Sequence, residues 1–522
     1  MVSGFTTVWS TVVIFLLSFH VQSFAFSVFR SKNLQSTLCR STQSFKSSFS
    51  LYETSEHVQS EINGGEPSNQ QNISLDNPEI NGKHEDSTIE LVEVPPASFS
   101  IETKATGPAQ SHVTTLTIHL GARGHPEPII IESGKIGRQA SGAVTLTRGQ
   151  TILYATASRD KDTKDNIDFA PLSVEHQERF SSAGLTSGSY NRRDGRPAEH
   201  EVLTCRLIDR PLRPMIHPRW RHETQILSWV LSYDGERSCD PLAVIASAAA
   251  LWISDIPLTK PVAAVSVGYI NGQFVVNPTN QQMEKSRLDL TVAGTKDAVL
   301  MIEGSADFLS EALMIEAVAV GHSTVKVICE ALEAFGHVVG KPKHLESLVP
   351  VPPGLPEAVE SVIGSKIDEL YNIQGGKEDF AAAMSKLSNE VNHSFQEIYP
   401  NNKSEVKEAF KDLLIRKMFL KAKSTGTRYD GRAFNEIRAI DVETSILPRV
   451  HGSALFTRGQ TQALATVTLG DSGMKQKIDK LDGIEQKRFY LQYNFPPSSV
   501  GETGRVGAPG RREVGHGNLA ER

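Results

Sequence analysis

The sequence predicts an α+β protein in which a mixed β-sheet is covered by helices and the whole unit is duplicated. The unit opens with two β-rich runs joined by a Gly-Gln turn, and helical stretches then alternate with hairpin signals. The pentapeptide TRGQT occurs at 147–151 and again at 457–461. Gly149 and Gly459 are 310 residues apart, which is a domain-sized period. We therefore expect one full copy of the unit and the beginning of a second.

A second pair of matching segments supports the duplication. SGSYNRRDGRP contains Arg192 and Arg193, and GAPGRREVGHG contains Arg511 and Arg512, 319 residues further along. Two motifs in the same order at nearly the same offset are hard to obtain by chance. The offset also excludes a solenoid of short repeats, whose periods are roughly 20 to 50 residues.

Composition narrows the classes of function. The 522 residues correspond to roughly three domains. The net charge of −6 gives no overall attraction to nucleic acid, so any RNA or phosphate site must be a local basic cluster. The four cysteines are far apart and show no metal-ligand spacing, which argues against a zinc site or a disulfide framework. We expect the mature protein to work in a reducing compartment.

The first 52 residues have the composition of a targeting sequence. Residues 1–25 contain the short apolar run VVIFLLSF followed by small residues, which predicts a signal peptide. That run is shorter than the roughly 20 apolar residues of a membrane span, so we expect no stable membrane association after processing. Residues 26–52 are rich in Ser and Thr and carry basic residues without acids, as transit peptides do. The combination resembles the bipartite presequence of proteins imported into complex plastids; secretion and a mitochondrial presequence are the alternatives.

The first copy follows a polar segment, 53–110, that we interpret as a disordered linker. Ordered structure is predicted from Thr114 onward, with the TRGQT hairpin, an irregular span over 158–187, and then the arginine loop. Helices are predicted at 199–210, stopped by Pro211, and at 241–253, which is apolar nearly all round and should be buried. Strands are predicted at 262–270, 273–276 and 288–293, the first two joined by an Asn-Gly hairpin turn.

A helical segment separates the copies. From Pro356 to about Lys423, Glu, Lys, Ala and Leu recur at helical spacing, with a break at Tyr399. The pattern predicts about three helices. The lysines of this segment are interleaved with glutamates, so a solvated surface and an RNA path both remain open.

The paired arginines are the candidate site. Guanidinium groups match the geometry of phosphate oxygens, and glycines let a backbone approach a ligand closely. We therefore predict that each pair binds phosphate or the RNA backbone, Arg192 with Arg193 in the first copy and Arg511 with Arg512 in the second. Tyr190, next to the first pair, is a candidate for stacking on a base, although packing at the loop edge is equally consistent.

From about residue 114 to the end, the chain resembles polynucleotide phosphorylase, the duplicated RNase PH family. The resemblance rests on RRDGRPAE, RLIDRPLRPM, DLTVAGT, RYDGR, ILPRVHGSALFTRGQTQALATVTLGD and YNFPPSSVGETGRVGAPGRREVGHG. It implies RNase PH-like cores at 112–345 and 428–522, the second incomplete, with an all-helical domain at 356–424. It also implies a homotrimeric ring that passes single-stranded RNA, and reversible phosphorolysis of RNA to nucleoside diphosphates with Mg²⁺ and inorganic phosphate.

The resemblance assigns roles to particular residues. Arg511 and Arg512 correspond to the substrate-binding pair of the second core, while Arg192, Arg193 and Tyr190 guide RNA in the first. The metal-binding carboxylates are expected beyond residue 522. In the first core, Asp289 is the carboxylate that remains at the corresponding positions, and we expect it to pair with Arg287. The run from Asp209 to Arg213 is interpreted as a helix end held by internal ion pairs.

Three functions are compatible with these features. The first is a phosphorolytic 3′-to-5′ exoribonuclease, or polyribonucleotide nucleotidyltransferase, active in RNA degradation and 3′-end processing. The second is a truncated, non-catalytic RNA-binding or assembly subunit, which would bind oligo(A) without degrading it. The third is a phosphate-binding metabolic protein, which would not bind oligo(A). We favour the first, although the activity of this chain is left open because of the missing carboxylates.

Overall fold

The computed structural model describes residues 97–521, except 107–110, 122–126, 165–166, 168, 187–196, 349, 371–376, 401 and 429. The described residues all belong to one compact unit, Pro95–Arg522. The predicted signal peptide, the transit-like segment and most of the predicted linker lie outside the described residues.

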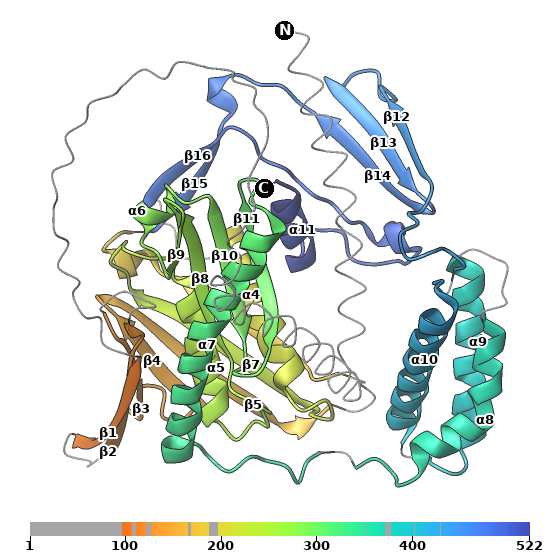
Figure 1. Cartoon of the computed structure of the whole chain (residues 1–522), viewed down its shortest axis with the longest axis horizontal. Helices are drawn as coiled ribbons and strands as arrows, with labels where there is room; N and C mark the ends of the chain where they lie inside the picture. The colour runs from red at the N-terminus through yellow and green to blue at the C-terminus, as the bar shows by residue number, and fades with distance from the viewer. Residues whose placement is uncertain are drawn as a thin grey trace, which may run out of the picture. The chain divides into compact units, whose positions relative to one another are not determined.

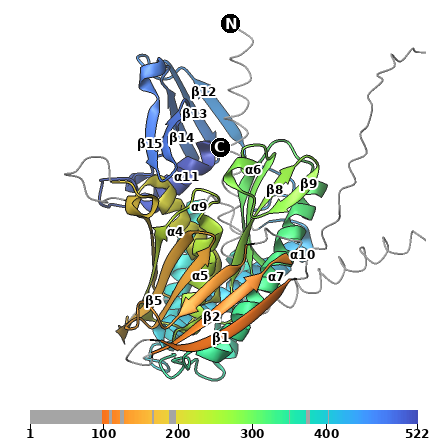
Figure 2. The same cartoon turned by 90° about the vertical axis from the view of Figure 1, so that its left-hand side faces the viewer.

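A seven-stranded sheet forms one layer of the first copy, in the order β1-β2-β3-β4-β5-β7-β6 (Figures 1 and 2). Its strands are β1 (Ser98–Thr106), β2 (Ser111–His119), β3 (Ile129–Ser133), β4 (Gly142–Arg148), β5 (Thr151–Thr163), β6 (Leu172–Glu178) and β7 (His222–Ser232). Only β6 and β7 run parallel. The predicted TRGQT hairpin is confirmed, because β4 and β5 pair up to Arg148 and Thr151, with Gly149 in the turn at φ 60°.

Strands β1 and β6 lie where the sequence predicts a disordered linker and an irregular span. β1 falls inside the predicted linker and pairs along its whole length with β2, so the linker prediction is wrong for Ser98–Thr106. β6 falls inside the predicted irregular span, and β5 also extends into it as far as Thr163. Because β6 helps to hold the candidate site, its presence matters for function.

Helix α5 (Asp240–Ile253) packs against both sheets of the first copy. All of its residues except Asp240 and Trp252 are buried, as its apolar sequence predicts. The second sheet has the order β11-β10-β8-β9, from β8 (Ala263–Ile270), β9 (Gln273–Val276), β10 (Leu288–Gly294) and β11 (Val299–Ala306). Asn271 and Gly272 turn at φ 50° and 82°, which confirms the predicted hairpin.

The long helix α7 (Glu311–Val339) packs on β8 and β10. Among the described residues it is the one helix long and apolar enough to cross a membrane. One face, which includes Gly321, Val325 and Ile328, is buried in the hydrophobic core of the first copy. Packing on the sheet therefore accounts for the apolar residues of this buried face.

Helix α4 (Glu199–Leu212) packs against β6 and α5. Pro211 lies inside the helix instead of stopping it, so the predicted end is wrong. A proline in the final turn removes only one backbone bond, and the chain turns into a short 3₁₀ helix at Arg213. The Arg213 guanidinium donates to both carboxylate oxygens of Asp209, at 3.0 and 2.6 Å, which confirms the ion pair predicted at this helix end.

The segment between the copies is helical, as predicted. It contains α8 (Leu355–Leu370), α9 (Lys377–Phe395) and α10 (Lys403–Thr425), which share their own hydrophobic core. The core is formed by Val359, Ile363, Leu387, Val391, Phe410 and Leu414, among others. The three helices therefore have a core separate from that of the first copy.

The second copy begins with the same hairpin as the first. Its elements are β12 (Ile440–Thr444), β13 (Gly452–Arg458), β14 (Thr461–Val467), β15 (Gln476–Lys480), β16 (Gly483–Lys487) and α11 (Arg511–Glu521). Gly459 turns at φ 60°, as Gly149 does. The 3₁₀ helices Phe180–Ala183 and Pro497–Val500 each end at a left-handed glycine with φ 72° and ψ 19°. The duplication is thus visible in the backbone itself.

Candidate phosphate-binding site

Arg511 and Arg512 occupy the first turn of helix α11, not a loop as the sequence predicts. Glu513 explains why the helix starts there. Its carboxylate accepts hydrogen bonds from the backbone N–H groups of Gly510 and Phe495, both at 2.7 Å. A carboxylate in the first turn caps a helix and interacts favourably with its dipole. Both arginines are therefore placed at the positive end of a helix.

Helix α4 of the first copy begins in the same way. The Glu201 carboxylate accepts from the N–H groups of Ala198 and Glu178, at 2.5 and 2.6 Å. The two helices also share a sequence pattern from this glutamate onward, EVLTCRLID in α4 and EVGHGNLAE in α11. Glu201 and Glu513 are thus equivalent, at an offset of 312 residues.

This equivalence corrects the predicted pairing of the two arginine motifs. Arg511 and Arg512 occupy the positions of Glu199 and His200, not those of Arg192 and Arg193. Arg192, Arg193 and Tyr190 lie outside the described residues. The second-copy arginine pair is therefore a feature of α11 alone and is not repeated at the start of α4.

Helices α4 and α11 pack against each other (Figure 1). Their packing brings five basic side chains together. We call them the basic cluster: Arg206 and Arg210 from α4, and Arg511, Arg512 and His516 from α11. Arg206 donates through Nη1 to the backbone oxygen of Arg511, at 3.4 Å. Gly515 permits this approach, because a Cβ there would lie 1.7 Å from the same Nη1 atom.

The charges of the basic cluster lower the pKa values of two of its members, Arg206 and His516. Burial lowers the pKa of Arg206, and the charges of Arg210 and Arg512 lower it further, while Glu303 and Asp209 offset part of this. Burial likewise lowers the pKa of His516, with additional contributions from Arg206, Arg512 and Arg210. Like charges held this close favour a bound anion, which would relieve the repulsion.

The four arginines of the cluster differ in their partners. Arg511 donates through Nη1 to the Val174 backbone oxygen at 2.6 Å and pairs through Nη2 with the Glu175 carboxylate. Arg210 pairs with Glu303. Arg512 lies over the Phe495 ring, 5.0 Å from its centroid. Within the described part of the chain, neither Arg206 nor Arg512 has a carboxylate partner, so these two guanidiniums are the ones available to an anion.

Strand β6, which holds Arg511, is itself fixed by a buried network. Burial raises the pKa of Glu178, but the hydrogen bond with His200 and the nearby His176, whose Nε2 lies 3.9 Å away, outweigh this and lower it to about 2. His200 contacts Glu178 through Nε2 at 3.0 Å, and His176 contacts Ser228 at 3.0 Å. The network connects β6 to α4 and β7. It therefore holds Val174 and Glu175, the β6 residues that bind Arg511, next to the other basic residues.

Sequence reasoning found two of these five residues. Arg206, Arg210 and His516 were missed, although a signal for two of them exists. Arg206 and Arg210 are four residues apart on a predicted helix, a spacing that places both on one face. The convergence with α11 depends on packing between copies, which no local pattern reveals.

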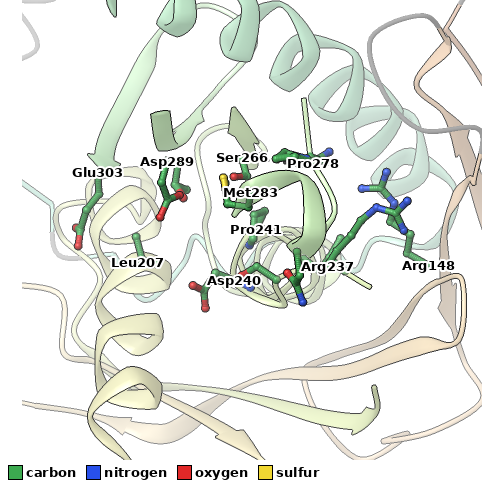
Figure 3. Close-up of a pocket in the computed structure, with 15 residues that line it drawn as sticks. Arg148, Leu207, Arg237, Asp240, Pro241, Ser266, Pro278, Met283, Asp289 and Glu303 are labelled. Carbon is green, nitrogen blue, oxygen red and sulfur yellow. Dashed lines mark hydrogen bonds between the residues drawn. The ribbon is translucent and has the colours of Figure 1, made fainter. Parts of the chain in front are cut away.

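A pocket of about 140 Å³ lies in the first copy and is lined in part by Glu303, the partner of Arg210 (Figure 3). Arg148 and Arg237 lie at one end of it, and Asp289 and Glu303 at the other. Asp289 does not pair with Arg287, contrary to the prediction, because Arg287 faces Asp307 at 3.7 Å. At the centre, burial raises the pKa of Asp240, and the carboxylate accepts a hydrogen bond from Thr204 at 2.6 Å.

The described residues do not fit a magnesium site at the basic cluster. Among them there is no group of three or more His, Cys, Asp or Glu side chains placed to hold a metal. The carboxylates near the cluster, Glu175, Glu303 and Asp209, are ion-paired with arginines. Mg²⁺ prefers oxygen ligands with little competing positive charge. No step of the chemistry is therefore assigned to a metal on these residues.

Comparison with known proteins identifies related families. The model of the 3′ exoribonuclease family, domain 1, matches residues 126–257 and again 436–522, and the model of domain 2 matches 260–324. Together they cover more than half of the chain. The repeated match to domain 1 agrees with the duplication seen in the backbone.

Curated relatives are more specific. A polyribonucleotide nucleotidyltransferase of Protochlamydia amoebophila is 48% identical over 412 residues, which cover 78% of this chain and 58% of the relative. A probable chloroplastic polyribonucleotide nucleotidyltransferase 1 of Oryza sativa subsp. japonica is 43% identical over 443 residues, covering 76% and 49%. The chain spans about half the length of the curated relatives it matches. A solved chain named archaeal exosome core aligns with a TM-score of 0.31 at 15% identity, covering 38% of this chain and 84% of that one, too weakly to support a conclusion.

Proposed function

Because the chain belongs to the 3′ exoribonuclease (RNase PH) family, with polyribonucleotide nucleotidyltransferases as relatives, we propose that it acts in the phosphorolysis of RNA from the 3′ end. The observation that carries the proposal is the basic cluster, to which both copies contribute. The proposed substrates are single-stranded RNA and inorganic phosphate, and the proposed products are nucleoside diphosphates and a shortened RNA. The reverse reaction polymerises nucleoside diphosphates.

In the proposed step, an oxygen of inorganic phosphate attacks the phosphorus of the 3′-terminal phosphodiester. A new P–O bond forms, and the bond from phosphorus to the 3′ oxygen of the preceding nucleotide breaks. That oxygen takes up the proton carried by the attacking phosphate and becomes the new 3′-hydroxyl. The terminal nucleotide leaves as its 5′-diphosphate, so atoms and charge balance.

The basic cluster suits this step for an electrostatic reason. An anionic nucleophile must approach an anionic diester, so positive charge is needed to hold both and to stabilise charge on the transferring phosphorus. Arg206 and Arg512 supply guanidiniums without carboxylate partners in the described part of the chain, and the N-terminus of α11 adds the positive end of its dipole. We propose that these groups bind the terminal diester and the incoming phosphate.

The remaining parts of the proposal rest on the family alone. They are a homotrimeric ring, RNA guidance by Arg192, Arg193 and Tyr190, and Mg²⁺ held by residues other than those described. Plastid location is proposed from the composition of residues 1–52 and from the chloroplastic name of the rice relative. Mitochondrial location is the alternative.

The function is tested with 5′-labelled oligo(A), Mg²⁺ and inorganic phosphate. We expect the oligomer to shorten one nucleotide at a time, with release of ADP and no shortening when phosphate is omitted. Binding without shortening would support the alternative, a non-catalytic RNA-binding or assembly subunit. Release of AMP, or a complete lack of oligo(A) binding, would contradict the proposal.

A further inference from the structure

Two carboxylates reach the basic cluster from strands on different sheets of the first copy. Glu175 on β6 pairs with Arg511, and Glu303 on β11 pairs with Arg210. Each carboxylate accepts a hydrogen bond from one Nη group of its arginine. These are the same groups that would otherwise hold phosphate oxygens. The structure thus shows half of the arginines of the cluster already occupied by anions of the protein.

We infer that Glu175 and Glu303 are internal counter-ions that occupy the arginine forks in the free protein and compete with an RNA phosphodiester for them. The inference rests on the proposed function for the identity of the competing anion. It makes both glutamates positioning residues, since they act through Arg511 and Arg210 and need not touch RNA. Arg206 and Arg512 then make the first contacts with the substrate, and the other two arginines are released as the phosphodiester replaces each carboxylate.

Exposure distinguishes the two pairs. The Arg511 and Glu175 side chains are 46% and 32% exposed, whereas those of Arg210 and Glu303 are 20% and 24% exposed. An exposed ion pair contributes little net free energy, so a phosphate exchanges with Glu175 more easily. Arg511 also keeps its bond to the Val174 oxygen during the exchange, which holds the guanidinium in place.

A purely structural role predicts the opposite behaviour. If Glu175 only fastens α11 to β6, its removal loosens the helix that carries Arg512, and affinity for RNA falls. If Glu175 is a competing counter-ion, its removal leaves Arg511 free for phosphate, and affinity rises. The salt dependence also differs, because each further phosphate contact to a single strand adds about 0.7 to the slope of log K against log salt.

The experiment measures binding of fluorescent oligo(A) to the full chain and to the variants Glu175→Gln and Glu303→Gln, from low to moderate salt. We expect each variant to bind about two- to fivefold more tightly at low salt, with a steeper slope by about 0.7. Glu360→Gln is the matched control, because Glu360 pairs with Arg416 between α8 and α10. Weaker binding, an unchanged slope, or an equal gain in the control would overturn the inference.

A second measurement separates this inference from the proposed function. Inorganic phosphate raises the melting temperature of a protein that binds it, and Glu175→Gln should enlarge that rise. If no variant binds oligo(A) but the phosphate effect grows in Glu175→Gln, the counter-ion role stands and the RNA function fails. If the phosphate effect does not grow and oligo(A) is not bound, both are wrong. Glu175 is partly exposed, so its substitution should not prevent folding.

Discussion

Replacing Arg206 and Arg512 together with alanine is expected to lower affinity for oligo(A) by at least about 100-fold. Each arginine offers charge-assisted hydrogen bonds worth about 1.5–3 kcal/mol, and neither has a carboxylate partner in the described part of the chain. Loss of both therefore removes about 3 kcal/mol or more if the two contacts are independent. Equilibrium binding at fixed salt measures the change.

Two further variants test whether the loss of affinity is specific to the basic cluster. Arg416→Ala removes an arginine outside the basic cluster and should leave affinity nearly unchanged. Gly515→Ala places a methyl group 1.7 Å from the present position of Arg206 Nη1, so the flexible end of that side chain must move. It should weaken binding with little loss of stability. If the double variant binds oligo(A) as tightly as the native chain, the cluster is not the binding site.

The second large effect is expected at the helix caps. Glu201→Ala should destabilise the first copy by about 2–4 kcal/mol, because two backbone N–H groups lose their acceptor and each unsatisfied buried donor costs about 1–3 kcal/mol. Glu201 is only 7% exposed, so water replaces the lost contacts poorly. Urea unfolding followed by tryptophan fluorescence measures the change.

Glu513→Ala is the matched variant in the second copy. Its carboxylate makes the same two kinds of contact, but Glu513 is half-buried whereas Glu201 is buried, so we expect little change in the unfolding of the first copy. We expect reduced affinity for oligo(A), because the start of α11 positions Arg511 and Arg512. Equal destabilisation by the two substitutions would contradict the difference in burial.

Strong local patterns in the sequence predicted much of the fold. The TRGQT hairpin, the apolar helix α5 and the three helices between the copies were predicted from turn chemistry and periodicity. Strand β6 was missed because its buried positions alternate between an apolar Val174 and a polar His176. His176 is acceptable in the interior only because Ser228 and the Cys205 sulfur satisfy part of its polar groups.

The candidate site was predicted in part, with the wrong register. The offset between the copies is 310 residues at the TRGQT turn, 317 at the 3₁₀ helix and 312 at the capping glutamate. Loops of different length between these elements cause the changes. Matching the arginine pairs by residue type alone did not take these changes in offset into account. Matching Glu201 with Glu513 by their hydrogen bonds gives the correct alignment of the two copies. Arg206 and Arg210 join the site only through the packing of α4 on α11.

The position of the RNA 3′ end relative to these side chains can be observed directly. A structure of the chain with oligo(A) and inorganic phosphate should place the terminal phosphodiester between Arg206 of α4 and Arg512 of α11, with at least one phosphate oxygen in contact with each guanidinium. A terminal phosphodiester bound elsewhere, such as at Arg148 and Arg237 in the first-copy pocket, would show that the basic cluster between the copies is not the phosphate-binding site.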